Sequence, residues 1–558
     1  MGHDHHHPHE HAHARTAEDL PRAMDTSVPD GELSRDELSR RSVLRRAGLL
    51  GAGLAAAGNV LTASPAAATQ DRAPRGGFRW LAGDHHVHTQ YSDDGKYRVL
   101  DHVQHGNAYG LDWMVITDHG GEQHAKIGVE KVNPDIKAAR AAFNDTLVFQ
   151  GLEWNIPGAE HGTVFVHPGR NEMSLLKEFE LTYDGRLTEA NPAKEALAIA
   201  GINFMADAVR RRRIDDALML ANHPARKGLD SPHEIRGWRD AQPRIFVGME
   251  GAPGHQAAGI PAPQGGGRAR GYYDGSHGSD AFAGYPPESY RTWGGFDWMT
   301  ATVGGVWDSL LAEGKPWWIT ANSDSHSVYA DNSVRGPNSN FAVDGKHADP
   351  VYGGTLALGE GDFWPGCYSR THVGATDFSY AAVMDGIRAG RVWVDHGGLI
   401  SGLDVRLRTS GGWAQTSSTL GGTLHARRGT PVELVITIDL ANGPNWAQFV
   451  PTLARVDVIQ GAVTGAVKDL DTLRAPETKV VKSFEVNKST GTVTFTYPLG
   501  RLDRPVYVRL RGTDGNRVAP GFHGAAVDPA GPAMDVQGDA DPWKDLWFYT
   551  NPIWALPY

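Results

Sequence analysis

Residues 83–94 form a histidine-rich segment that reads Gly83-Asp84-His85-His86-Val87-His88-Thr89-Gln90-Tyr91-Ser92-Asp93-Asp94. A short apolar run at residues 78–82 precedes it and is typical of a buried strand. His86 and His88 are one residue apart, so on an extended chain both side chains leave the same face. Two imidazoles at a strand end can bind one divalent metal, and Asp93 can add an oxygen ligand. An isolated His-x-His also occurs in loops without metal, so the interpretation depends on the rest of the chain.

The composition sets limits on the class of protein. The chain has 558 residues, which predicts more than one domain. Apolar residues make up 40% and charged residues 21%, which allows large cores and excludes a mainly disordered protein. The net charge of −11 argues against general affinity for nucleic acid or anionic membranes, so we expect no nucleic-acid partner. Cys367 is the one cysteine, which excludes an intrachain disulfide and a cysteine-based zinc site.

Residues 1–68 are predicted to lie outside the fold. Seven histidines in residues 1–13 cannot build a core, and this tract is either a natural leader or an added tag. Residues 39–45, Ser-Arg-Arg-Ser-Val-Leu-Arg, match the twin-arginine export signature, and an apolar run and an Ala66-x-Ala68 cleavage signal follow. We therefore expect the twin-arginine translocase to export the protein to a secreted or extracytoplasmic location without a stable membrane anchor. An uncleaved N-terminal anchor is the alternative.

A recurring pattern extends from residue 78 to about residue 330. Short apolar strands run into polar residues: Asp118-His119, Glu153, His223-Pro224, Glu250 and Asp324-Ser325-His326. Helical stretches lie between the strands, for example at residues 193–213 and 295–311. This alternation predicts an α/β fold of parallel βα units, about seven of which suggest a barrel. In such barrels the active site lies at the carboxyl ends of the strands, where most of these polar residues fall.

The remaining segments do not follow this pattern. Residues 251–290 and 328–366 are rich in Gly, Pro, His and aromatics, and they are either lids or substrate walls, or surface loops without such a role. Beyond residue 401 short alternating runs separated by turn signals predict a β-sandwich. The predicted domains are a leader and signal at 1–68, a metallohydrolase barrel with the two insertions at 69–400, and a β-rich domain at 401–558.

Each polar residue at a strand end also has an ordinary structural explanation. Asp118 and His119 could be a buried hydrogen-bond pair, His223 a packed core histidine, and Glu250 one half of a structural salt bridge, which for Glu250 is the preferred reading. Taken together, however, such groups crowded at adjacent strand ends without a cation would cost several kcal/mol each. A metal site is simpler, and imidazoles and carboxylates without thiolates suit zinc, manganese or iron rather than calcium.

These motifs resemble the polymerase and histidinol phosphatase (PHP) superfamily. The matching segments, in the order of the family, are His86-x-His88-Thr89-x-x-Ser92-Asp93, Thr117-Asp118-His119, Gly151-x-Glu153, His223-Pro224 and Asp324-x-His326. The resemblance implies a distorted (β/α)7 barrel that carries two or three divalent metal ions.

By this resemblance, nine residues are metal ligands. His86, His88, Glu153 and Asp324 would hold one ion, and Glu153 would bridge to a second ion held with His223 and a histidine after the glutamate. For that histidine we choose His161 over His167. Asp93, His119 and His326 would hold a third ion. His119, Asp324 and His326 are also the candidate catalytic residues.

The favoured function is hydrolysis of phosphomono- or diesters by a metal-activated hydroxide in a multinuclear site, with a small-molecule phosphoester as substrate. Arg226 and Arg370 are candidates to bind phosphate oxygens, because a planar guanidinium suits phosphate, although Arg226 could also cap a helix or face solvent. Segments near residues 368–391 and 551–553 resemble secreted, carbaryl-hydrolase-type PHP proteins. This leaves open a metal-dependent carboxylic or carbamate ester hydrolase. A non-catalytic exported metal- or carbohydrate-binding protein is the third possibility.

Overall fold

The structure is a computed structural model that describes residues 77–558 except 274, 412–414 and 521–527. The predicted leader, twin-arginine signature and cleavage site at residues 1–68 lie outside the described residues. Within the part of the chain that is described, no helix combines the length and the apolar character that crossing a membrane requires.

Nine α-helices are described: α2 (Val99–Ala108), α3 (Val129–Ala142), α4 (Glu172–Tyr183), α5 (Lys194–Arg210), α6 (Pro232–Ala241), α7 (Trp298–Ala301), α8 (Val306–Ala312), α9 (Phe341–Asp344) and α10 (Tyr380–Arg388). The strands up to residue 400 are β1 (Arg79–Asp84), β2 (Trp113–Ile116), β3 (Leu147–Asn155), β4 (His161–Val166), β5 (Ala217–Ala221), β6 (Phe246–Ala252), β7 (Thr292–Trp293), β8 (Phe296–Asp297), β9 (Trp318–Ala321), β10 (Ser333–Val334), β11 (Val351–Tyr352), β12 (Ser369–Ala375) and β13 (Val392–His396). The later strands are β14 (Ile400–Thr409), β15 (Ser417–Ser418), β16 (Thr423–Ala426), β17 (Pro431–Leu440), β18 (Arg455–Ala462), β19 (Lys479–Glu485), β20 (Thr492–Arg501), β21 (Val506–Thr513), β22 (Val518–Ala519), β23 (Gly531–Pro532), β24 (Trp547–Thr550) and β25 (Ile553–Pro557).

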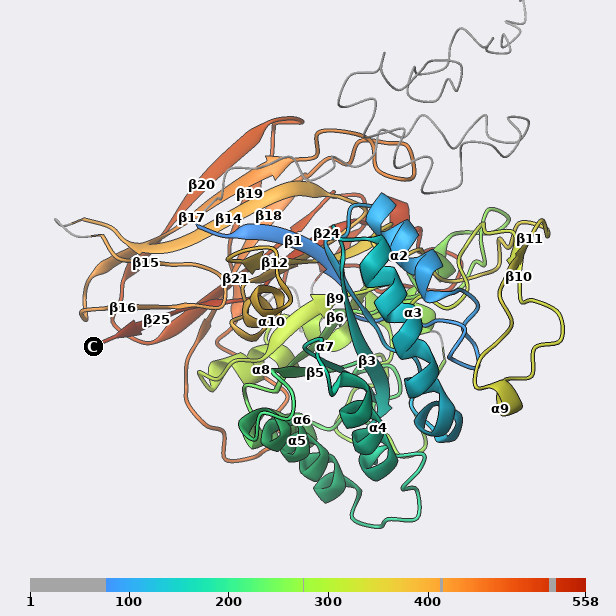
Figure 1. Cartoon of the computed structure of the whole chain (residues 1–558). Helices are drawn as coiled ribbons and strands as arrows, with labels where there is room; N and C mark the ends of the chain where they lie inside the picture. The colour runs from blue at the N-terminus through green and yellow to red at the C-terminus, as the bar shows by residue number, and fades with distance from the viewer. Residues whose placement is uncertain (1–76, 274, 412–414, 521–527) are drawn as a thin grey trace, which may run out of the picture. The chain divides into compact units, whose positions relative to one another are not determined.

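One large mixed sheet organises the described chain. Its main path runs β16-β25-β21-β24-β13-β12-β1-β2-β3-β4-β5-β6-β9. The strands β2, β3 and β5 are buried along their whole length, which explains why β2 and β5 read as continuous apolar runs. In Figure 1 the helices α4, α5 and α6 lie together in the lower part of the view. The predicted α/β class is therefore confirmed.

The sheet is not made of parallel units alone. β1, β2 and β3 pair in parallel, and so do β5, β6 and β9. β4 lies between β3 and β5 and is antiparallel to both. The connection from β3 to β4 covers only residues 156–160, and a parallel pair needs a crossover of a dozen or more residues. The prediction of uniformly parallel βα units is wrong at this strand.

Closure of the strands into a barrel is not shown. The path ends at β9, whose ladder partner among the described strands is β6. β9 nevertheless lies next to β12, because the Ala321 backbone N–H donates to Thr371 Oγ1 at 2.8 Å and Thr371 Oγ1 donates to the Ala321 carbonyl at 2.6 Å. Just beyond β1 and β9, an isolated parallel bridge joins Val87 and Ser325, and the His88 backbone N–H donates to the Ser325 carbonyl at 3.1 Å. The two ends of the predicted barrel thus lie side by side without a continuous ladder among the described strands.

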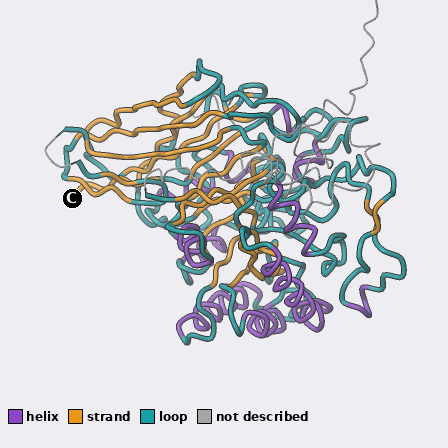
Figure 2. Tube along the Cα trace, turned by 45° about the horizontal axis from the view of Figure 1, so that its top comes forward, coloured by secondary structure: helices purple, strands orange, loops and turns teal. Residues whose placement is uncertain are grey.

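The β-rich part after residue 400 shares its sheet with the preceding strands. β13 pairs with β24, and β24 pairs with β21. A second sheet, β15-β14-β17-β20, buries one face in a common core with the large sheet, through residues such as Val405, Ile436, Val458 and Leu510. The long strands of this part run side by side in Figure 2. A separate β-sandwich is not confirmed, and the domain boundary at residue 400 stays a prediction.

The helix boundaries follow local sequence signals. Ser231 begins α6 with a capping box, in which its hydroxyl accepts from the Glu234 backbone N–H and Glu234 reaches back, and Pro232 takes the first helical position. The helix predicted over residues 295–311 is instead two short helices, α7 and α8. Gly304 has φ 74°, a left-handed conformation that interrupts the helix between them.

Candidate metal centre

The carboxyl ends of the parallel strands bring the predicted ligands to one edge of the sheet. His86 and His88 follow β1, His119 follows β2, His223 follows β5, and Asp324 follows β9. Glu153 lies near the end of β3, and His161 begins the antiparallel β4 directly opposite, where Asn155 pairs with His161. The antiparallel direction of β4 is what places its first residue at this edge.

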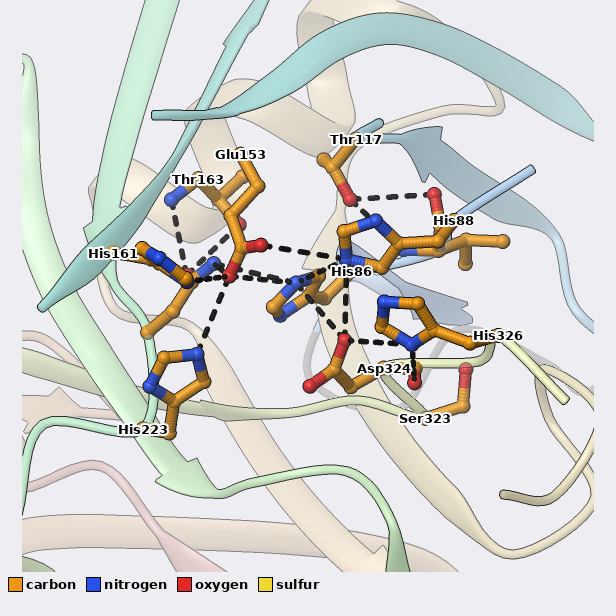
Figure 3. Close-up of polar contacts among 12 residues, drawn as sticks. His86, His88, Thr117, Glu153, His161, Thr163, His223, Ser323, Asp324 and His326 are labelled. Atoms are coloured by element: carbon orange, nitrogen blue, oxygen red, sulfur yellow. Dashed lines mark hydrogen bonds and ion pairs between the residues drawn. The ribbon is translucent and has the colours of Figure 1, made fainter. Parts of the chain in front are cut away.

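Three ligand atoms converge at the centre of the group (Figure 3). The Nε2 atoms of His86 and His88 are 2.9 Å apart, and Asp324 Oδ1 lies 3.2 Å from each of them. All three side chains are buried. The two imidazole nitrogens and the carboxylate oxygen have the identity and spacing of ligands to one cation.

Glu153 lies between this group and three further histidines (Figure 3). Its Oε1 is 3.1 Å from His86 Nε2, 3.0 Å from His161 Nδ1 and 3.3 Å from His223 Nε2. Its Oε2 is 2.6 Å from His119 Nδ1. A carboxylate whose two oxygens face different sets of imidazoles can bridge two cations.

Outer partners fix the ring orientation of the central histidines. Glu250 Oε1 is 2.6 Å from His86 Nδ1, and Ser92 Oγ is 2.9 Å from His88 Nδ1. With their Nδ1 atoms held in this way, both rings direct Nε2 toward the centre. Glu250 therefore serves the site from outside the ligand group, and Asp118 does the same by accepting the hydroxyl hydrogen of Ser92 at 2.9 Å.

One predicted ligand differs from the structure. Asp94, not Asp93, lies beside His119 and His326: its Oδ2 is 3.1 Å from His119 Nε2 and its Oδ1 is 3.4 Å from His326 Nε2. The carboxylate of the exposed Asp93 belongs to none of the described ligand groups, and its backbone carbonyl accepts from His347 Nε2 at 2.7 Å. The turn after Ser92 shifts the acidic ligand by one residue.

The structure distinguishes the two candidate histidines around β4. His161 lies beside Glu153, whereas His167 is at the other end of the strand and faces Asp215 at 3.7 Å. If Glu153 and His223 share an ion, as predicted, His161→Ala should weaken the binding of that ion and lower activity at least about 100-fold, while His167→Ala should leave both unchanged. Metal content and ester turnover of the two variants check this. Equal effects of the two replacements would contradict the assignment.

The two predicted arginines lie in different places. Arg226 Nη2 donates to Glu160 Oε2 at 3.2 Å, and Glu160 is itself 3.5 Å from His223 Nδ1, so Arg226 lies at the edge of the centre. Arg370 donates to the backbone carbonyls of Gly366 and Tyr109. The structure does not bring Arg370 to the ligand group.

The electrostatics of the centre favour a cation. Burial alone would raise the pKa of Glu153, but His161, His86 and His119 hold it well below its usual value. Burial and the charge of Arg226 lower the pKa of His223 to about 4, which keeps its imidazole neutral, as metal binding requires. Burial alone would lower the pKa of His86 and His119 as well, but Asp324 and Glu153 raise that of His86 well above its usual value, and Glu153 and Asp94 raise that of His119 to about 10. The carboxylate charge of the centre therefore calls for positive charge, which a bound cation would supply.

Buried atoms in the centre also fit a metal ion. Asp324 Oδ1 and His119 Nδ1 are buried, and their near neighbours are other predicted ligand atoms: Asp324 Oδ1 faces His86 and His88, and His119 Nδ1 faces Glu153. Such mutual crowding of ligand atoms fits a cation between them. The backbone of His223 and Asp324 is left-handed, with φ of 33° and 46°, and strain of this kind is concentrated at functional sites. Imidazole and carboxylate ligands, without thiolates, suit zinc, manganese or iron.

Two site residues were missed in the sequence. His255, in the first insertion, has Nε2 2.8 Å from Asp324 Oδ2, and its Nδ1 is 2.5 Å from Oδ1 of Asp362, in the second insertion. Burial alone would lower the pKa of His255, but these two carboxylates raise it to about 10. Neither residue follows a predicted strand, so the strand-end pattern could not find them.

Comparison with known proteins identifies the class of this chain. Residues 84–185, which hold His86, His88, His119, Glu153 and His161, match the family model of the PHP domain. These residues are thus similar to a PHP domain, and the predicted resemblance to the PHP superfamily is confirmed. A solved structure from Bacteroides vulgatus, a two-domain protein containing a predicted PHP-like metal-dependent phosphoesterase, matches at 14% identity. That match covers 78% of this chain and 91% of the other, but its TM-score of 0.31 is too low to establish a common fold. No curated protein matches the chain.

Proposed function

We propose that this protein is a metal-dependent phosphoesterase that hydrolyses phosphomono- or diesters at a multinuclear centre. The observation that carries the proposal is the position of Glu153, whose two oxygens lie 2.6–3.3 Å from four histidine nitrogens. Asp324 Oδ1 adds a second carboxylate 3.2 Å from His86 and His88. Two carboxylates among this many imidazoles provide ligands for more than one ion.

The predicted ligands of such a centre form three sets, one for each ion. His86, His88, Glu153 and Asp324 would hold one ion, Glu153, His161 and His223 a second, and Asp94, His119 and His326 a third. Bound divalent ions lower the pKa of water and neutralise charge that develops on phosphoryl oxygens. The protein holds the ligands in place, excludes bulk water from the buried side of the centre, and presents the Arg226 guanidinium at its edge.

Turnover of matched esters tests the proposal. We expect the full chain, loaded with zinc or manganese, to hydrolyse bis(4-nitrophenyl) phosphate or 4-nitrophenyl phosphate much faster than 4-nitrophenyl acetate. The preferred phosphate ester then assigns diesterase or monoesterase activity. Turnover of the acetate alone would replace the proposal with a carboxylic or carbamate ester hydrolase. Bound metal without turnover of any ester would indicate a metal-binding protein without catalysis.

Arg226 is proposed to bind a phosphate oxygen that the ions leave free. Its Nε is buried and has no hydrogen-bond partner among the described residues, so this donor is unsatisfied in the protein alone. A hydrogen bond to a charged group contributes about 1.5–3 kcal/mol, so Arg226→Ala should lower kcat/KM about 10- to 100-fold. Arg226→Lys should recover little, because it lacks the planar fork.

The control for Arg226 is Arg370→Ala, which removes an arginine that donates to loop carbonyls. It should lower the melting temperature without a comparable change in kcat/KM. Kinetics and thermal unfolding of the two variants separate these effects. An unchanged kcat/KM for Arg226→Ala would show that Arg226 does not bind the substrate.

We also propose export by the twin-arginine translocase, supported by residues 39–45 of the sequence. Replacing Arg40 and Arg41 by Lys should retain the protein in the cytoplasm, as measured by cell fractionation. Export of the replaced chain at the original level would contradict this proposal.

A further inference from the structure

The two long insertions meet at the metal centre through one pair of side chains. His255 belongs to the insertion at residues 251–290, and Asp362 belongs to the insertion at residues 328–366. His255 Nδ1 lies 2.5 Å from Asp362 Oδ1, and the Ala258 backbone N–H donates to the Gly361 carbonyl at 3.0 Å beside them. The insertions are therefore joined to each other where both reach the ligand group.

The backbone of the first insertion is fitted closely against the segment that carries Asp324. The His255 backbone N–H donates to the Ser323 carbonyl at 3.2 Å, and His255 itself is left-handed with φ 55°. A Cβ at Gly254 would lie 2.2 Å from Asp324 Cβ, so only glycine permits this approach. A loop packed this closely on a ligand-bearing segment has a fixed position relative to it.

The side chain of His255 contacts the oxygen of Asp324 that faces away from the central histidines. Asp324 Oδ1 lies 3.2 Å from His86 and His88 Nε2, while Asp324 Oδ2 lies 2.8 Å from His255 Nε2. A carboxylate can only accept hydrogen bonds, and both ring nitrogens of His255 face carboxylates. In this arrangement Nε2 is placed to donate to Asp324 Oδ2, and Nδ1 faces Asp362 Oδ1 on the other side of the ring.

Asp362 connects the same pair to the next ligand. Its Oδ2 accepts from the backbone N–H groups of His326 and Ser327, at 2.6 Å and 2.8 Å. One carboxylate thus holds His255 with one oxygen and the backbone of His326 with the other. The side chain of Asp362 is 3% exposed and that of His255 is 12% exposed, so water competes little for these bonds.

We propose that His255, held by Asp362, is a positioning residue of the metal centre: its Nε2–H fixes the carboxylate of Asp324 so that Oδ1 faces the ion. The inference rests on the proposed metal binding. It also assigns a role to both insertions, because each contributes one residue to the link. The arrangement matches that of Glu250 on His86, where an outer group sets the direction of a ligand.

The test measures metal affinity rather than activity. Full-length His255→Leu and His255→Gln are loaded with Zn²⁺ in competition with a chelator of known affinity, beside the unmodified chain. Loss of an outer partner typically weakens metal binding 10- to 100-fold, and we expect this for His255→Leu. The glutamine amide places an N–H near the position of imidazole Nε2, so His255→Gln should recover most of the affinity.

A matched control is His277→Leu, which removes a histidine of the same insertion that bonds to Ser289 instead of to the centre. It should bind Zn²⁺ like the unmodified chain. Melting temperatures of the metal-free proteins show that each variant is folded. Affinity of His255→Gln as weak as that of His255→Leu would make His255 itself a ligand and overturn the proposal.

Unchanged affinity in both His255 variants would also overturn the proposal, while leaving the proposed function intact. The proposed function itself would be overturned if the unmodified chain bound no more Zn²⁺ than a chain in which His86 and His88 are both replaced by Ala. The two failures are therefore distinguishable in one set of measurements.

Discussion

Asp324→Ala should abolish metal loading and activity together. Its Oδ1 lies 3.2 Å from the Nε2 atoms of both His86 and His88, and its Oδ2 is 2.8 Å from His255. Alanine removes the anionic ligand, and the neutral imidazoles that remain supply no negative charge to balance the charge of the ion. We expect ester turnover to fall by at least about 1000-fold, which corresponds to about 4 kcal/mol of transition-state stabilisation.

Metal content and turnover are measured on the same sample of this variant. The control is Asp377→Ala, which removes an exposed aspartate just beyond β12. This end of β12 pairs with the first residue of β1, whereas the predicted ligands follow the last residue of β1. That replacement should leave both quantities unchanged. His88→Ala should lose metal and turnover as Asp324→Ala does. Turnover retained by Asp324→Ala would show that Asp324 is not needed for the reaction.

Glu153→Gln should remove more than one ion from the centre. The two oxygens of Glu153 face His86, His161 and His223 on one side and His119 on the other. Glutamine keeps the size of the side chain but loses the charge that a bridging ligand supplies. We expect Glu153→Gln to bind at least one ion per chain fewer than a variant in which a single histidine is replaced. Its activity should fall about 1000-fold or more.

The matched control is Glu180→Gln, which changes another buried carboxylate paired with an imidazole. Glu180 Oε2 is 2.8 Å from His124 Nδ1, outside the ligand groups. This replacement should destabilise the fold without changing the metal content. If Glu153→Gln lost only stability, and kept its ions and activity, Glu153 would be a structural residue rather than a bridge.

Much of the centre could be predicted because its residues follow strand ends. His86, His88, Glu153, His223 and Asp324 lie at or just beyond the ends of apolar runs, and parallel strands bring such ends together. Asp94 was missed because two aspartates are adjacent after Ser92, and only the three-dimensional turn shows which one faces His119. The sequence offers no local signal for that choice.

The insertion residues could not be found in the same way. His255 and Asp362 lie in Gly- and Pro-rich loops without periodicity. They are in contact although they are 107 positions apart in the sequence. Their role depends on the loop path, which the short strand-end motifs do not encode. Gly254 carries the one physical hint, since its place is explained only by the close approach to Asp324.

The strand arrangement was only partly predictable. The antiparallel direction of β4 follows from the short connection at residues 156–160, which is too short for a parallel crossover. The continuation of the sheet through β13, β24 and β21 depends on pairing between residues about 150 positions apart, such as Val394 with Tyr549. Alternation predicts that these segments are strands but does not reveal their partners.

The most direct test of the central claim is a metal count on the full chain and on the same chain with His86 and His88 both replaced by Ala. Both proteins carry the same histidine-rich leader, so its loose binding cancels in the difference. Hydrolysis of bis(4-nitrophenyl) phosphate is followed in the same samples. We predict at least one more ion per chain in the unmodified protein, because His86 and His88 would hold one ion of the centre, together with phosphoester turnover that the variant lacks. Equal metal contents in the two proteins would contradict the metal centre and the function proposed for it.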